Sequence, residues 1–358
     1  MSKENVYEDL IAFHPGSYVE DIVDELNITQ AEFADRLGVS AKTISKIING
    51  EDRISNDIAN KLANLTGISI KTWMNLQEAY DIKFLEIENK KTVDKEENVC
   101  RLIDFGYFKK NHLVRSKKYS IKDKVDILHQ LLNVSSLSNL ESFNPVVSYR
   151  NTKGFEEKSI INSNVMLELA MNEARNVTDV KYTKSKLNKI LPIIREMSLD
   201  SPEVFYPKLK ELLLGCGIVL VGLPNLKNAY LNGATKKFKN GSVLLLITDR
   251  NKYSDVFWFS LVHELGHIYF NDFYSNYENE EEYQQKEDRA DKFAADFFIP
   301  QDMYSDFVNE GKFDKKSILN FAKILGINPS IIVGRLQKEK FIDYKDLQEL
   351  KTSYSIVM

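Results

Sequence analysis

The sequence predicts an α+β protein that is mostly helical, with an all-α N-terminal region, a helical middle region and a C-terminal domain that adds a small sheet. Residues 15–80 have the apolar spacing of several short helices in succession. Two short apolar runs, Ile218–Val221 and Ser242–Thr248, predict strands, and the turn signal Lys239–Gly241 precedes the second. Longer segments with helical spacing follow, at about residues 253–270, 283–298 and 314–325.

The length of 358 residues is sufficient for two or three domains. We expect boundaries that give the segments 1–82, 83–198 and 199–358. The stretch Glu86–Asn98, near the start of the middle region, is charged and poor in apolar residues. It is therefore either a solvated helix or a linker.

The composition argues against a disordered chain and against a membrane protein. Hydrophobic residues make up 43% of the sequence, and no apolar run approaches the length that crosses a bilayer. The N-terminus lacks the basic and apolar segments of a secretory signal. The two cysteines, Cys100 and Cys216, suit neither a disulfide framework nor a Cys-based zinc site. We therefore expect a cytoplasmic protein with reduced thiols and no membrane partner.

The segment His263–His267, with the sequence His-Glu-Leu-Gly-His, has the spacing of a metal site on a helix. Residues four apart lie on one face of a helix, so both imidazoles can bind the same ion. Glu264 stands beside that axis, where it can reach a water molecule at the ion without being a ligand. The alternative is a buried helix that carries two hydrogen-bonded histidines.

A third ligand is expected, because catalytic zinc has three protein ligands and one open position. The next helix offers Glu287 and Asp291, which are four residues apart. We assign Glu287 as the third ligand, with Asp288 as its main competitor, and expect Asp291 to accept a hydrogen bond from a ligand imidazole. Ala290 and Ala294 keep this face small, so that the two helices can approach closely. The alternative for these acids is a solvated helix face.

These residues predict one Zn²⁺ ion per chain and a hydrolytic reaction. Zinc polarises a scissile carbonyl and acidifies a water molecule, and Glu264 takes the proton and passes it to the leaving amine. The predicted strand Asn232–Phe238 can offer its edge to an extended peptide. The expected activity is therefore that of a zinc-dependent endopeptidase.

The segment Ile28–Gly50 predicts a helix-turn-helix. Thr29 and Glu32 have the spacing of a capping box. Gly38 ends the first helix and gives the turn, and Ser40 caps the second helix, which in this motif enters the major groove of DNA. The residues expected to face bases or phosphates are Gln30, Ser40, Ala41, Lys42, Thr43 and Lys46. The alternative is a small helical bundle that binds proteins or forms a dimer.

Charge is distributed unevenly along the chain. Residues 1–80 contain seven Lys/Arg and thirteen Asp/Glu, so the charge of this region does not by itself predict nucleic-acid binding. Residues 81–200 contain 21 Lys/Arg and 17 Asp/Glu. Two basic runs fall here, Lys109–Lys124 and Lys181–Lys189. Each is either a solvated helix face or a contact for nucleic acid or an acidic partner.

Two families share motifs with this sequence. The N-terminal region resembles the HigA-type subgroup of XRE helix-turn-helix regulators in the segments His14–Gly16, Gln30–Gly50 and Trp73–Gln77. The C-terminal region is similar to the ImmA/IrrE family of bacterial metallopeptidases in five segments: His263–His267, Glu287–Asp291, Phe293–Ala295 with Pro300, Gly233–Thr235 and Val333–Gln337. The resemblances cover about residues 14–80 and 200–340.

The resemblance implies a zincin-like fold and a zinc endopeptidase of narrow specificity, fused to a domain that binds double-stranded operator DNA. Relatives cleave a helix-turn-helix repressor and so relieve repression. The expected substrate is such a repressor or this protein's own DNA-binding domain, and a homodimer is one arrangement open to the chain. The alternative is a non-enzymatic regulator of the antitoxin type that uses the metallopeptidase fold as a sensor or scaffold. Glu264 favours the enzyme, because a scaffold has no use for a general base.

Overall fold

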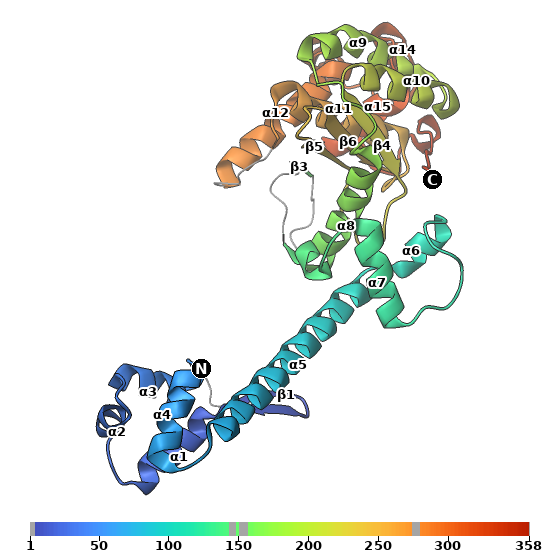
Figure 1. Ribbon diagram of the computed structural model, residues 1–358. Coiled ribbons are helices and arrows are strands. Elements are labelled where there is room, and N and C mark those ends of the chain that lie inside the picture. The colour runs from blue at the N-terminus through green and yellow to red at the C-terminus, as the bar shows by residue number, and fades with distance from the viewer. Residues whose placement is uncertain (1–3, 143–147, 150–156, 274–279, 358) are drawn as a thin grey trace. The chain divides into compact units, whose positions relative to one another are not determined.

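The computed structural model describes residues 4–142, 148–149, 157–273 and 280–357. The chain forms two compact units, Met1–Glu97 and Asn98–Met358 (Figure 1). The expected boundaries near residues 82 and 198 stay predictions.

The first unit is a bundle of short helices that follows a hairpin. The hairpin, β1 (Glu4–Tyr7) and β2 (Leu10–Phe13), is antiparallel and was not expected from the sequence. The helices are α1 (Gly16–Glu25), α2 (Gln30–Leu37), α3 (Ala41–Ile48), α4 (Asn56–Thr66) and the first part of α5 (Ile70–Leu102).

Local capping explains where α2 and α3 begin and end. The Thr29 side chain accepts a hydrogen bond from the Glu32 N–H, and Ser40 does the same for Thr43. Gly38 ends α2 with a φ of 67°, a left-handed conformation that glycine adopts without a steric penalty. The carboxylate of Glu32 accepts a hydrogen bond from Arg36 one turn later, so only the Thr29 half of the predicted capping box is formed. The helix-turn-helix signals in the sequence therefore correspond to real helix ends.

The motif His14–Gly16 leads into α1 and packs against the C-terminal end of α3. The Nδ1 atom of buried His14 accepts a hydrogen bond from the Gly16 N–H. A Cβ atom on Gly16 would lie 1.8 Å from the carbonyl oxygen of Ile47, so only glycine fits there. The apolar core of this unit is formed by side chains from all five helices, including Val19, Phe33, Ile44, Ile47, Leu62 and Trp73.

The charged stretch Glu86–Asn98 lies inside α5, so the structure favours the helix over the linker. This helix begins in the first unit and ends in the second. It has no continuous apolar face, which fits its many charged residues.

The second unit is built on a four-stranded sheet with the order β3-β5-β6-β4. Its strands are β3 (Ser148–Tyr149), β4 (Ile218–Leu223), β5 (Gly233–Lys237) and β6 (Val243–Thr248). β4 and β6 are parallel, whereas β5 is antiparallel to both of its neighbours. The turn expected at Lys239–Gly241 joins β5 to β6.

Both faces of this sheet are buried, which explains why β4 and β6 are continuously apolar. Successive side chains of a strand point to opposite faces. In β6, Leu244 and Leu246 belong to one core, and Leu245 and Ile247 belong to the other. The first core is covered by helices between residues 98 and 174, and the second by two helices between residues 184 and 215 together with the helices that follow the sheet (Figure 1). Part of the middle region therefore shares a core with the C-terminal sheet.

The helices before the sheet are α6 (Phe105–Lys110), α7 (Ile121–Leu132), α8 (Glu157–Ala174), α9 (Lys184–Glu196) and α10 (Pro202–Gly215). Those after it are α11 (Ser254–Phe270), α12 (Glu280–Phe298), α13 (Gln301–Glu310), α14 (Lys315–Leu325) and α15 (Pro329–Lys338). Within the described residues no single helix is long and apolar enough to span a membrane. Only α14 and α15, bent by 116°, pass that test as a pair, by length and composition alone.

Candidate metal centre and DNA-binding helix

The centre of the second unit is the helix α11, which packs under β5 and β6. Its residues His263, Glu264 and His267 are each at most 1% exposed. The helix α12 packs along it and brings in Glu287. These polar side chains are thus removed from bulk water by the apolar residues that surround them.

Small residues allow α11 and α12 to approach closely. A Cβ atom on Gly266 would lie 3.2 Å from the Phe293 ring and 3.3 Å from the Cα atom of Ala290. Ala290 and Ala294 are fully buried in this contact. The expectation that these alanines keep the helix face small is therefore confirmed.

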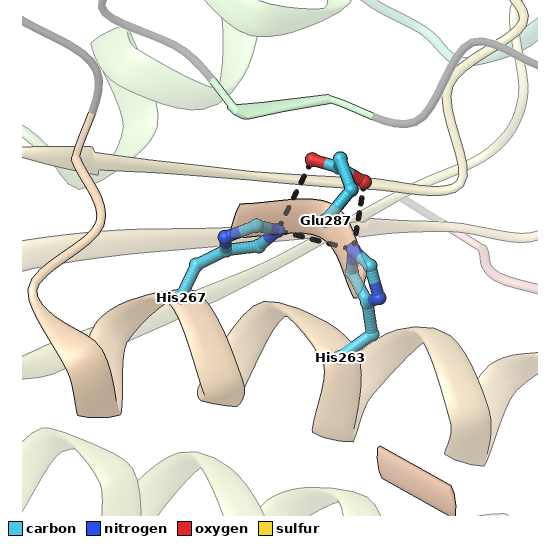
Figure 2. A group of neighbouring side chains, drawn as sticks. All are labelled: His263, His267 and Glu287. Carbon is cyan, nitrogen blue, oxygen red and sulfur yellow. Dashed lines mark hydrogen bonds and ion pairs between the residues drawn. The ribbon is translucent and has the colours of Figure 1, made fainter. Parts of the chain in front are cut away.

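The side chains of His263, His267 and Glu287 converge on one point, as Figure 2 shows. The two Nε2 atoms are 3.1 Å apart. Each also lies 3.4 Å from a carboxylate oxygen of Glu287, Oε2 for His263 and Oε1 for His267. One donor atom from each residue falls within 4.8 Å of the others.

This geometry fits a tetrahedral zinc ion. Ligand atoms about 2.0–2.1 Å from one zinc ion lie about 3.3–3.4 Å from one another. The two Nε2 atoms, 3.1 Å apart, are close to this spacing, and each lies 3.4 Å from a different oxygen of Glu287, so the carboxylate faces both imidazoles. Two imidazole nitrogens and one carboxylate oxygen also form a donor set that zinc accepts, with space for a fourth ligand.

The electrostatics favour a positive charge between these donors. Burial acts to lower the pKa of His263, but hydrogen bonds to Asp291 and Glu287 outweigh it and raise the pKa to about 9. Burial acts to raise the pKa of Glu287, but the two imidazoles lower it to about 2, so the carboxylate is ionised at neutral pH. Burial keeps the pKa of His267 below its usual value, which favours the neutral form that binds a metal.

A chain of polar contacts supports His263 from behind. Its Nδ1 atom lies 2.8 Å from Oδ1 of Asp291, and Oδ2 of that residue accepts a hydrogen bond from Lys338 at 3.2 Å. This contact is the one expected for Asp291, and it holds the ring so that Nε2 faces the centre. Lys338, which comes from α15, was not expected from the sequence. Asp288 lies on the exposed side of α12, where it accepts a hydrogen bond from Gln284.

The buried carboxyl group of Glu264 lies directly against β5. A Cβ atom on Gly233 would stand 2.6 Å from Cγ of Glu264 and 3.0 Å from its Oε1 atom. Glycine is therefore required for the strand to approach this carboxyl group so closely.

The edge of β5 differs from the expectation that it is open to a peptide. Its residues Ala234 and Thr235 pair with Tyr149 and Ser148 of β3. The prediction of a free edge over Asn232–Phe238 is wrong at these two positions, because the chain itself satisfies the backbone groups there.

The residues expected to contact DNA lie along α2 and α3 of the first unit. Gln30, Ser40, Ala41 and Lys42 are exposed, and Thr43 and Lys46 are half-buried. The hydroxyl groups of Ser40 and Thr43 are 2.8 Å apart, so they hold each other at the start of α3. Lys46 forms an ion pair with Asp52 at 3.5 Å, which partly neutralises its charge.

Two known families match separate parts of the chain, one in each unit. Residues 19–73 match the helix-turn-helix family, and residues 232–337 match the family described as IrrE N-terminal-like domain. The uncharacterized HTH-type transcriptional regulator YddM of Escherichia coli is 34% identical over 80 residues, which cover 22% of this chain and 81% of the relative. The chain belongs to the helix-turn-helix transcriptional regulators. Its second unit carries an IrrE-type peptidase domain.

Other known proteins match a comparable share of this chain. Virulence-associated protein I of Dichelobacter nodosus is 30% identical over 22% of this chain and 73% of the relative. The structure of the Pseudomonas aeruginosa antitoxin HigA with the higBA promoter is 34% identical, covers 24% of this chain and 94% of that chain, and has a TM-score of 0.22.

The peptidase domain of the regulator contains a cavity of about 1190 Å³ on the Asp291 side of His263, and its lining includes neither the three candidate ligands nor Glu264. Its walls include Phe259 and Ser260, one turn before His263 on α11, and Asp291 on α12. The far wall is formed by α15 and the C-terminal residues 344–351. A cavity of this size accepts several side chains of a peptide.

The segment Val333–Gln337 builds the wall formed by α15. A Cβ atom on Gly334 would lie 2.3 Å from Asp255, so glycine lets α15 pack against α11. Arg335 donates a hydrogen bond to the carbonyl oxygen of Ile299. Gln337 donates hydrogen bonds to backbone carbonyl groups of the C-terminal segment, the shortest at 3.0 Å to Asp346.

Proposed function

We propose that this regulator binds operator DNA through its first unit and hydrolyses a peptide bond in a protein substrate through its second unit. The observation that carries the proposal is that donor atoms of His263, His267 and Glu287 lie within 4.8 Å of one another. The buried Glu264 lies on α11, the helix that carries both histidines. One zinc ion per chain is the cofactor that this donor set fits.

Each side chain has a separate role in the proposed reaction. A zinc ion held by the three ligands would polarise the scissile carbonyl and acidify a water molecule. Glu264 accepts the proton of the attacking water at a carboxylate oxygen and passes it to the leaving amine. Asp291 fixes the orientation of the His263 ring, and Lys338 in turn holds Asp291. Gly233 keeps β5 close enough to limit the positions that the Glu264 carboxyl group can take.

We propose that substrate side chains enter the cavity beside His263. The wall of the cavity combines the aromatic rings of Phe259 and Tyr253 with charged groups such as Asp255, Asp291 and Lys338. Fixed polar groups in a cavity wall orient a bound peptide and make its binding selective. This fits an endopeptidase of narrow specificity.

The DNA-binding half of the proposal rests on α3, whose exposed face carries Lys42. In helix-turn-helix proteins the second helix enters the major groove, and its N-terminal residues contact the bases. We assign Gln30, Ser40, Ala41, Lys42, Thr43 and Lys46 to this interface. A homodimer of the regulator would present two copies of α3 to a palindromic operator.

The proposed substrate is a helix-turn-helix repressor, or the DNA-binding unit of the regulator itself, and the proposed site of action is the cytoplasm. Cleavage of such a substrate would relieve repression. The combination of a DNA-binding unit with a peptidase-family domain on one chain supports this, because the first unit would bring the second to regulated DNA.

The test is cleavage of the repressor encoded nearest to this protein. Wild-type protein and the Glu264→Gln variant are incubated with that repressor, with and without zinc, and mass spectrometry locates cuts in both the repressor and the regulator. We expect cleavage by the wild type only, while the variant retains one zinc ion per chain. Zinc binding without cleavage by either protein would favour the non-enzymatic regulator, in which the metal centre acts as a sensor.

A further inference from the structure

The basic run Lys109–Lys124 forms an exposed surface of the second unit. It contains seven Lys/Arg residues and one acid, and it extends from the end of α6 to the start of α7. Five of its basic side chains are exposed, namely Lys110, Arg115, Lys117, Lys118 and Lys122. Within the part of the chain that the structure describes, none of the seven forms an ion pair with a carboxylate.

Two of the nearby acids serve helix capping, and a third, Asp126, is exposed on α7. The Asp104 side chain accepts a hydrogen bond from the Gly106 N–H at the start of α6. Asp123 closes a capping box with Ser120 at the start of α7, and this contact lowers its pKa. The surface therefore keeps a strong positive potential in solution.

Aromatic rings hold part of this surface in place. The ammonium groups of Lys109 and Lys117 lie 5.5 and 5.0 Å from the centre of the Tyr119 ring. The ammonium group of Lys124 lies 5.6 Å from the centre of the Phe105 ring. Such contacts restrict the side chains before a ligand binds.

The fold adds basic residues from distant parts of the sequence. A hollow of about 500 Å³ is lined by Arg101, Lys124, Lys158 and Lys227, which come from four separate segments of the second unit. Asp104 is the single acid among the described residues of its lining. Four cations around one hollow create a site for an anionic group, which the sequence alone does not indicate.

The second basic run, Lys181–Lys189, has a different character. Lys184 lies 3.7 Å from the centre of the Tyr269 ring, and Lys186 donates a hydrogen bond to the carbonyl oxygen of Gly215. The backbone contact holds Lys186, and this run contains four lysines where the first contains seven basic residues, so it is a weaker match to an external polyanion.

We propose that the basic face, defined as Lys109–Lys124 with Arg101, Lys158 and Lys227, binds the phosphate backbone of double-stranded DNA without sequence preference. Phosphate contacts by Lys and Arg supply most of the non-specific affinity of DNA-binding proteins. A membrane surface fits less well, because the exposed large hydrophobic residues of the described chain include none between 98 and 132.

The proposed contact would compensate for the net negative charge of the first unit. Residues 1–97 contain eleven Lys/Arg and nineteen Asp/Glu, so the unit that reads the operator is repelled overall by DNA. A second contact on the same chain raises the effective concentration of the first at the duplex. The inference rests on the proposed DNA binding of the regulator and is independent of the peptidase reaction.

The test compares full-length proteins on a labelled duplex of mixed sequence, about 30 base pairs or roughly three helical turns long. The face variant is Lys110→Gln with Lys118→Gln and Lys122→Gln. Its matched control removes three exposed lysines elsewhere in the second unit, as Lys312→Gln with Lys316→Gln and Lys323→Gln. Affinity is measured by fluorescence anisotropy over a range of salt concentrations.

We expect the face variant to bind at least about tenfold more weakly at low salt, with a salt slope reduced by about 0.9 per lost phosphate contact. The control variant should match the wild type. The inference would be overturned if the face variant bound the duplex with the affinity and salt slope of the wild type and the control variant. It would also be overturned if the face variant lost only its binding to phosphatidylserine vesicles, measured in parallel. The variant Lys42→Ala with Lys46→Ala separates the two DNA proposals. If it weakens binding while the face variant does not, only the basic face is refuted.

Discussion

The replacement Gly233→Ala tests how closely β5 confines the side chain proposed as the general base. The added methyl group would stand 2.6 Å from Cγ of Glu264, 3.0 Å from Oε1 and 3.1 Å from Cδ. Carbon atoms in contact normally lie about 3.5–4.0 Å apart. Either the strand or the carboxyl group must therefore move by about 1 Å. A displacement of that size near reacting atoms lowers a rate by about 100-fold.

The expected outcome is a catalytic defect without loss of the metal. We expect kcat/KM for repressor cleavage to fall about 100-fold, measured by mass spectrometry of the products. Zinc content should stay at one ion per chain, because the three atoms nearest to the new methyl group all belong to Glu264. Overpacking should lower the free energy of unfolding by about 1–3 kcal/mol, measured by denaturant titration.

The control is Gly215→Ala at the end of α10. A Cβ atom there has no neighbouring atom within 4 Å, so this variant should match the wild type in rate and zinc content. A wild-type cleavage rate in the Gly233→Ala protein would refute the argument that β5 positions Glu264.

Three further predictions concern the two units separately. Asp291→Asn should lower zinc affinity by about 10–100-fold in a competition titration with a chelating dye, and unchanged affinity would contradict its role in orienting His263. Gly16→Ala places a methyl group 1.8 Å from a backbone oxygen, so it should destabilise the first unit by about 3 kcal/mol or more and abolish DNA binding with zinc content unchanged. Lys42→Ala with Lys46→Ala should weaken binding to the operator and reduce the salt slope by up to about 2, while cleavage of a peptide substrate continues at the wild-type rate.

Features that depend on local spacing were predictable from the sequence. The spacing of His263 and His267 is that of one helical turn, and α11 brings them together as that spacing requires. The caps at Thr29 and Ser40 and the turn at Gly38 also involve residues within a few positions of one another. Such features can be predicted from the sequence because they depend only on backbone geometry between residues that are close in the sequence.

Features that join distant segments were not predictable. Lys338 contacts Asp291 from 47 positions away, and no local pattern in α15 marks that lysine. β3 pairs with β5 across 85 positions, from Tyr149 to Ala234, as part of a sheet whose order cannot be derived from strand patterns alone. The hairpin of β1 and β2 was missed because each strand has only four residues and most of them are exposed or half-buried.

The central claim is tested most directly by X-ray diffraction from crystals of the zinc-loaded protein, with anomalous data collected on both sides of the zinc absorption edge. We predict one strong peak per chain, about 2.0–2.2 Å from the Nε2 atoms of His263 and His267 and from a carboxylate oxygen of Glu287, with no fourth protein ligand. A peak elsewhere, or a coordination sphere closed by a fourth side chain, would contradict it.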